Sequence, residues 1–388
     1  MKNATAYVGR NMRQYGILAA LLAIIIFFQI LTGGLLLSPN NVASLIQQNA
    51  YVMILSVGMV MVIIARHIDL SVGSLVGFIG GVIGLLVVGS GLPWPLAVAI
   101  ALALGLLIGC WQGFWVAIMG IPAFIVTLGG MLIFRGLTVV LVQRTVSGLP
   151  PSFVSIANGS LPPWLGYLKN YDGVTIVIGL SAIAALIYSQ MRARRRARAA
   201  GRTVDSLRGA VVRLAIYSAA IGALTALLAY SAGGTPIVLV IVGVVILIYS
   251  FIMNRTVIGR QIYAVGGNLK AARLSGINVR RVDFLVFVNM GLLSALAAIV
   301  TTSRAGAAVS TAGNLYEMDA IAAAYIGGAA VSGGIGRVSG AIIGALIMGV
   351  LNMGLSIMAV DSAWQQAIKG LVLLCAVALD IVGKRRAS

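Results

Sequence analysis

Long apolar segments follow one another along the whole chain and are separated by short polar stretches. A helix needs about 20 apolar residues to cross the hydrocarbon core of a bilayer, and many of these segments reach or approach that length. The predicted spans are 17–37, 50–65, 70–89, 96–118, 123–142, 174–190, 214–232, 236–253, 284–302, 320–335, 338–358 and 364–382. The pattern therefore predicts an all-α fold, a polytopic transmembrane helical bundle of about twelve spans.

Two of the breaks between apolar segments are rich in glycine, one around Ile68 and one around Gly336. Such a break can mark a broken or re-entrant helix instead of a full turn, so about ten spans are the alternative. Glycines spaced by four also fall on one face of a helix and let helix backbones approach closely. We interpret two such sets as packing positions: Gly73, Gly77 and Gly81, and Gly336, Gly340 and Gly344.

Composition agrees with a membrane protein, because 60% of the residues are hydrophobic and only 9% are charged. An ordinary soluble domain has about a quarter of its residues charged. The first apolar segment follows basic residues, as a signal peptide does. It is too long for the apolar region of a signal and lacks a cleavage pattern, so we expect a retained first helix.

The 27 basic and eight acidic residues give a net charge of +19. The basic residues gather between apolar segments, as expected of cytoplasmic loops that face anionic lipid. No aromatic platform for stacking bases accompanies them, which argues against nucleic-acid binding. If the N-terminus lies inside, only Arg144, Lys169 and Arg304 fall in outer loops. The charge pattern therefore predicts cytoplasmic N- and C-termini.

We treat residues 1–388 as a single transmembrane domain with three notable loops. Residues 143–173 form a proline-containing periplasmic loop, which is either a docking surface or a cover over helix ends. Residues 191–213 form a basic cytoplasmic loop that anchors two helices. Residues 254–283 form a cytoplasmic loop with one or two helical turns closed by Gly276. Its apolar knob, Ala271, Ala272 and Leu274, either docks into a partner's groove or adsorbs to the membrane interface.

No set of residues typical of a catalytic or metal site is present. His67 is the only histidine, so histidine-based metal clusters and the usual histidine triads are excluded. The sequence also lacks a Gly-x-x-x-x-Gly-Lys-Ser/Thr loop, so the chain cannot by itself be an ATPase of that type. We expect a non-catalytic subunit that binds no metal and no cofactor.

Polar and glycine residues within the apolar segments are candidates for a substrate path. Asp69 stands at an N-cap position and either caps the next helix or hydrogen-bonds a polar solute together with Ser71. Arg135 lies within an apolar segment and either pairs with an acid or carbonyl or extends toward the interface. Gly333 and Gly334 lie in a dense glycine stretch that predicts a bend. The predicted path comprises these five residues.

Four segments together resemble the membrane permeases of bacterial ABC importers for monosaccharides, the ribose, xylose, arabinose and galactose group. They are 68–74, 122–128 with 134–136, 259–277 and 327–355, in the right order over most of the chain. The stretch 172–232 is longer than in ribose-type permeases and adds about two spans, which favours the xylose type. The resemblance implies that the 259–277 loop contacts an ATPase. The implied coupling residues are Gly266, Gly267, Asn268, Ala271, Ala272, Arg273, Leu274 and Gly276.

The resemblance implies a multi-pass permease of the bacterial inner membrane that imports a monosaccharide, xylose or a related pentose or hexose. The implied partners are a cytoplasmic ABC ATPase carrying ATP and Mg, a periplasmic sugar-binding protein, a second permease copy and membrane lipid. The alternative is an ion-coupled secondary transporter of a small polar solute, which needs buried acids or histidines. We interpret the acids as lying near predicted helix ends, which argues against it: Asp69, Glu317, Asp319, Asp361 and Asp380. A channel is a further alternative.

Overall fold

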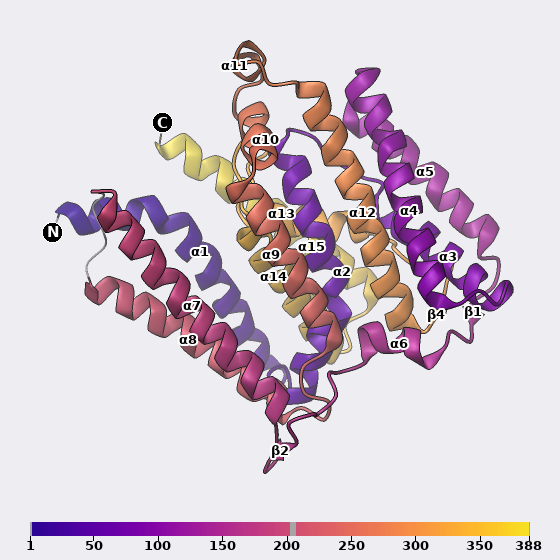
Figure 1. The fold of residues 1–388 in the computed structure, drawn as a ribbon, viewed down its shortest axis with the longest axis horizontal. Coiled ribbons are helices and arrows are strands. Elements are labelled where there is room, and N and C mark those ends of the chain that lie inside the picture. Colours follow the sequence, from indigo (N-terminus) through magenta and orange to yellow (C-terminus); the bar gives the residue numbers. More distant parts are fainter. Residues whose placement is uncertain (1, 202–206, 388) are drawn as a thin grey trace. The chain divides into compact units, whose positions relative to one another are not determined.

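The computed structural model describes residues 2–201 and 207–387, and this part of the chain is almost entirely helical (Figure 1). Its α-helices are α1 (Lys2–Leu31), α2 (Pro39–Ile64), α3 (Val72–Gly84), α4 (Trp94–Gly113), α5 (Ala123–Leu141), α6 (Pro151–Asn158), α7 (Gly173–Ala199), α8 (Leu207–Tyr230), α9 (Ile237–Arg255), α10 (Val257–Gly267), α11 (Leu269–Leu274), α12 (Val279–Ala305), α13 (Tyr316–Ile326), α14 (Val338–Ile357) and α15 (Ser362–Ala387). Two π-helical segments, η1 (Leu85–Gly89) and η2 (Phe114–Ile118), continue α3 and α4.

Four two-residue strands complete the described structure: β1 (Val146–Ser147), β2 (Tyr167–Leu168), β3 (Tyr171–Asp172) and β4 (Ala307–Ala308). β1 pairs antiparallel with β4, and β2 pairs antiparallel with β3. The predicted all-α polytopic fold is confirmed, because nine helices in the described residues are long and apolar enough to cross a membrane. They are α2, α3 with η1, α4 with η2, α5, α7, α8, α9, α12 and α14.

Residues 320–335 do not form the full span that their apolar length predicts. α13 has only 11 residues and ends at Ile326, after which the chain turns through glycines with positive φ. At 1.5 Å per residue this helix is about 16 Å long, roughly half of the hydrocarbon core. The chain near Gly336 therefore follows the alternative of a broken or re-entrant helix instead of a full span. The first predicted span, 17–37, also ends early at Leu31, because the backbone turns at Gly33 and Gly34.

The chain divides into two compact units. Unit 1 comprises Met1–Leu36, Leu45–Asn158 and Val238–Ser388, and unit 2 comprises Leu37–Ser44 and Gly159–Ile237. In unit 1, α12 packs along α4 and α3, and α14 packs against α13 and α1. In unit 2, α7 packs against α8. These two helices account for the stretch that was predicted to add about two spans.

The core of unit 1 lies around α2, α3, α12 and α14, whose apolar windows are mostly buried. Gly73, Gly77 and Gly81 on α3 and Gly340 and Gly344 on α14 lie at close approaches as predicted, whereas Gly336 precedes α14 and is not on its helix face. A Cβ on Gly77 would lie 2.5 Å from the Ala312 carbonyl oxygen, and a Cβ on Gly344 would lie 1.9 Å from that of Ala323. Only glycine allows these backbones to approach so closely.

The predicted loops contain regular structure. In Figure 1, α11 lies at one end of unit 1, and α6, β1 and β4 lie at the opposite end. The 254–283 loop and residues 143–158 of the predicted periplasmic loop therefore occupy opposite ends of that unit, while residues 159–173 belong to unit 2. The basic segment 191–213 is mostly helical, because α7 continues to Ala199 and α8 begins at Leu207. Residues 202–206, including Arg202, lie outside the described residues.

Candidate functional site

A buried polar cluster begins in the non-helical connection between α2 and α3. Asp69 is fully buried, and its Oδ1 accepts hydrogen bonds from the Ser71 backbone N–H at 2.9 Å and the Ser71 hydroxyl at 2.6 Å. The Ser71 hydroxyl oxygen in turn accepts a 2.6 Å hydrogen bond from Gln112 Nε2 on α4. The N-cap residue of α3 is Ser71, not Asp69. Asp69 instead orients this N-terminus by binding the N-cap residue.

The cluster has hydrogen-bonding capacity that the described residues leave unused. Asp69 Oδ2, Gln112 Oε1 and Ser74 Oγ are buried without a hydrogen-bond partner there. Burial raises the pKa of the Asp69 carboxyl to about 6, although its hydrogen bonds with Ser71 lower it. A buried acceptor without a donor is costly. The site is therefore suited to a solute or a water that donates hydrogen bonds.

Glu317 at the start of α13 lies beside this cluster, where α3 crosses the segment before α13. A Cβ on Gly73 would lie 2.1 Å from Glu317 Oε2 and 2.4 Å from the Gly313 carbonyl oxygen. Arg135 on α5 donates to the Ala312 carbonyl oxygen at 2.9 Å. Arg135 and Asp69 both lie within electrostatic range of Glu317. Three predicted path residues, Asp69, Ser71 and Arg135, thus gather around the start of α3.

Gly333 and Gly334 lie elsewhere, in a tight turn between α13 and α14. Both have positive φ, +78° and +73°, and the Gly334 N–H donates to the Ile64 carbonyl oxygen at 2.9 Å. Arg66 follows α2 and donates from Nε to the Gly266 carbonyl oxygen at 2.7 Å and from a terminal nitrogen to that of Gly267 at 3.1 Å. The two glycines therefore pack against the predicted coupling segment and not against Asp69.

The coupling segment presents a single short helix beyond α10. Asn268 caps α11, because its Oδ1 accepts a 3.0 Å hydrogen bond from the Ala271 N–H, and Gly276 closes it with φ +80°. Ala271 and Arg273 are exposed, and Leu274 is 90% exposed. Ala272 is buried at 4%, which corrects the predicted knob. The Ala272 side chain lies on the face of α11 that packs against the rest of the protein. The exposed apolar knob therefore consists of Ala271 and Leu274.

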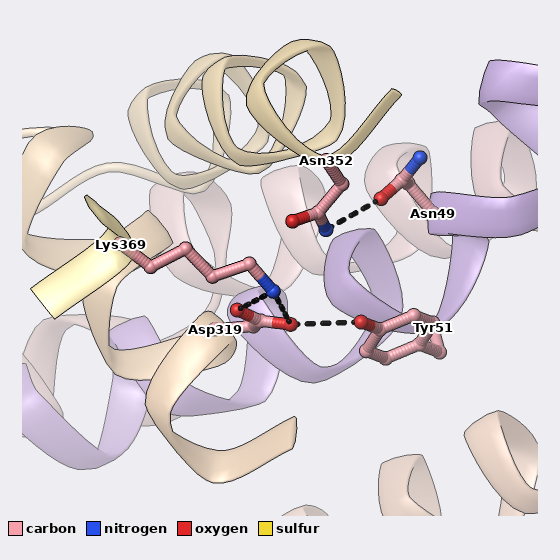
Figure 2. Close-up of polar contacts among 5 residues, drawn as sticks. All are labelled: Asn49, Tyr51, Asp319, Asn352 and Lys369. Atoms are coloured by element: carbon pink, nitrogen blue, oxygen red, sulfur yellow. Dashed lines mark hydrogen bonds and ion pairs between the residues drawn. The ribbon is translucent and has the colours of Figure 1, made fainter. Parts of the chain in front are cut away.

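A second buried carboxylate joins α2, α13 and α15 (Figure 2). Lys369 Nζ lies 3.2 Å from Asp319 Oδ1, and the Tyr51 hydroxyl donates to Asp319 Oδ2 at 2.8 Å. Beside them, Asn352 Nδ2 donates to Asn49 Oδ1 at 3.1 Å. From the sequence, Asp319 stood out only as an acid near a predicted helix end, and its partners and Gln112 were not predicted. Their only signal was polar residues within apolar segments, Lys369 and Asn352 among them.

Comparison with known proteins places this arrangement in a family. Residues 41–377 match the family model described as branched-chain amino acid transport system / permease component. The chain belongs to this family of transport permeases. The permease is 43% identical over 378 residues to the xylose transport system permease protein XylH of Escherichia coli strain K12, covering 97% of this chain and 93% of that protein.

Two further relatives support the assignment. The XylH protein of Haemophilus influenzae is 38% identical over 97% of the permease and 98% of its own length. The ribose import permease protein RbsC of Escherichia coli strain K12 is 36% identical over 88% of the permease and 85% of its own length. No solved structure matches the chain. The family resemblance read from the sequence motifs is confirmed, and the permease is a multi-pass membrane protein.

The described residues of the permease contain no group of three or more His, Cys, Asp or Glu side chains that could hold a metal ion. The geometry offers a polar interior and a short exposed helix. The polar interior includes the Asp69 cluster, Glu317 and the Asp319 group. The exposed helix is α11. Both lie within the matched residues.

Proposed function

We propose that the permease is the membrane subunit of an ABC importer for a monosaccharide, xylose or a related pentose or hexose, in the bacterial inner membrane. ATP hydrolysis takes place on a partner subunit, which also binds the ATP and Mg. The observation that carries this proposal is the 43% identity to a xylose permease over 97% of the chain. The ribose permease relative supports the same class of substrate.

The ATPase partner docks on α11. Leu274 is 90% exposed at the tip of this helix, and an exposed leucine beside Ala271 is suited to a shallow apolar groove. Arg66 ties the preceding turn to the end of α2, so a displacement of α11 is passed directly to the membrane helices. This connection gives ATP hydrolysis on the partner a mechanical route into the permease.

The remaining partners follow from the same proposal. A periplasmic sugar-binding protein docks at the opposite end of unit 1, where α6 lies. A second copy of the permease completes the translocation path, and membrane lipid covers the exposed apolar helices. The permease itself catalyses no reaction and binds no cofactor.

The test is copurification from detergent-solubilised membranes of the native host. We expect an ABC ATPase and a soluble sugar-binding protein to accompany the permease. The complex should hydrolyse ATP faster when the sugar-loaded binding protein is added. Recovery of the permease without any ATPase, from membranes that still take up the sugar, would contradict the proposal.

The structure favours one other candidate more than the sequence does. Asp69, Glu317 and Asp319 do lie at helix ends, but all three are buried, because α3 and α13 begin inside unit 1. Buried acids are what an ion-coupled secondary transporter requires. Uptake driven by a proton or sodium gradient, with the permease as the only protein, would establish that alternative.

A further inference from the structure

A small cavity lies in unit 1 near the end that carries α6. Its volume is about 140 Å³. We call it the tyrosine pocket, and it is lined mainly by Gln47, Gln48, Tyr51, Thr301, Arg304 and Tyr316. These residues come from α2, the last turns of α12 and the first residue of α13. One water takes roughly 30 Å³ in the liquid, so the pocket accommodates a small ring but not a peptide.

The lining chemistry selects a neutral, polyhydroxylated ligand. The rings of Tyr51 and Tyr316 stack with centroids 3.7 Å apart and an interplanar angle of 19°, and together they give the pocket an aromatic surface. The amide of Gln48 offers both donors and acceptors, as sugar hydroxyls require. The described lining residues include no carboxylate, so nothing there attracts a cation.

The one cationic lining residue is already engaged. Arg304 donates to the Asn158 side-chain oxygen, and Gln47 Nε2 donates to the Asn158 carbonyl oxygen at 3.1 Å. Asn158 is the last residue of α6. The outer wall of the tyrosine pocket is thus fixed to α6, and part of the hydrogen-bonding capacity of Arg304 is used in that contact.

The inner wall is fixed by the buried ion pair. The Tyr51 hydroxyl donates to Asp319, which Lys369 contacts as well (Figure 2). Tyr51 therefore contributes its ring to the tyrosine pocket, while its hydroxyl group is hydrogen-bonded to Asp319. Asp319 is only 6% exposed. It is a positioning residue that does not itself line the pocket.

We propose that the tyrosine pocket is where the permease contacts the monosaccharide after the binding protein releases it. The sugar ring lies on the tyrosine rings, and its hydroxyls exchange hydrogen bonds with Gln48 and Thr301. This inference rests on the proposed function and adds the residues that contact the substrate. The position of the pocket beside α6 makes it an early contact for a sugar that enters from the proposed periplasmic end.

The first test uses the whole importer in proteoliposomes, with xylose uptake and ATP hydrolysis measured at equal permease abundance. Gln48→Leu and Tyr316→Leu should each lower uptake severalfold, up to about tenfold, because the loss of one hydrogen bond or ring contact lowers affinity by about that factor. Tyr51→Phe keeps the ring but loses the bond to Asp319, so it should raise KM for the loaded binding protein with kcat nearly unchanged. Tyr188→Leu is the matched control, since Tyr188 is exposed on α7 at 63%, and it should behave as wild type.

The second test detects occupancy directly. Gln48→Cys is labelled with a maleimide during ATP-driven import, in a chain whose Cys110 and Cys375 are replaced by alanine. Xylose should slow labelling severalfold, whereas a disaccharide too large for the pocket should not. Tyr188→Cys should label at the same rate with or without xylose.

The outcomes separate the pocket from the proposed function. If the importer transports xylose normally while Gln48→Leu and Tyr316→Leu are as active as wild type, the tyrosine pocket is overturned and the importer stands. Unchanged labelling of Gln48→Cys during active import has the same meaning. If the wild-type complex transports no monosaccharide, the proposed function fails and the pocket loses its ligand with it.

Discussion

At the scale of single residues, each buried polar group forms hydrogen bonds with particular partners. Substitutions of single residues can therefore test the role of each group. Asp69 accepts two hydrogen bonds from Ser71. Asp69→Asn keeps an oxygen acceptor, so α3 should still form and sugar uptake should remain at least half-maximal. Asp69→Ala leaves the Ser71 donors without an acceptor and should lower stability by about 1–3 kcal/mol. Thermal denaturation and uptake assays check both. Complete loss of uptake in a well-folded Asp69→Asn protein would favour ion coupling instead.

The ion pair between Asp319 and Lys369 gives a second residue-scale prediction. Lys369→Met leaves a buried carboxylate beside Tyr51 without its counter-charge. The cost should lie at the low end of the roughly 3–5 kcal/mol expected for breaking a buried pair, because the Lys369 side chain is still 24% exposed. Replacing both residues, Asp319→Asn with Lys369→Met, should recover much of the lost thermal stability. A double variant no more stable than Lys369→Met would show that the pair is not coupled.

At the scale of elements, α11 is the part whose function can be disrupted without disturbing the fold. Leu274→Asp places a charge in the apolar contact with the ATPase and should abolish copurification and uptake. Membrane abundance should persist, because Leu274 contacts almost nothing in the permease itself.

Two variants of α11 serve as controls. Lys270→Gln should have a mild effect, since an exposed charge at the edge of the contact contributes little. Ala272→Asp should lower abundance instead, because Ala272 is buried. Normal uptake by Leu274→Asp would make α11 a passive connector.

The close helix crossings allow a matched test with glycine. A Cβ on Gly344 would lie 1.9 Å from the Ala323 carbonyl oxygen, whereas one on Gly129 would meet nothing within 4 Å. Gly344→Ala should therefore force α13 and α14 apart and cost about 1–3 kcal/mol or more. Gly129→Ala on α5 should be neutral or slightly stabilising. Equal melting temperatures for the two variants would contradict the packing described for α14.

The long helices were predictable from the sequence because apolar length and polar breaks are local features. α13 was predictable only as the broken-helix alternative, since the apolar length of 320–335 favours a full span while Gly333 and Gly334 predict the bend that the structure contains. The candidate site was predictable only in part. Asp69, Ser71 and Arg135 stand out as polar residues in apolar surroundings. Glu317 was named only as an acid near a helix end, because its place against Gly73 joins residues far apart in the sequence.

At the scale of the whole molecule, α6 and α11 mark opposite ends of unit 1, and the charge pattern predicts which end is cytoplasmic. Ser152→Cys on α6 should react with an impermeant maleimide added to spheroplasts. Ser275→Cys, which follows α11, should react only after permeabilisation. Both are made in a chain without its native cysteines. Labelling of both from the outside would refute the assigned orientation.

ATP-driven sugar uptake tests the central claim most directly. Proteoliposomes containing the permease and its ATPase are loaded with ATP and Mg, and radiolabelled xylose is added outside with its binding protein. We predict that xylose accumulates only when ATP, ATPase and binding protein are all present, and that a protonophore does not abolish the accumulation. Accumulation by liposomes that contain the permease alone, driven by an imposed ion gradient and insensitive to ATP, would contradict the account.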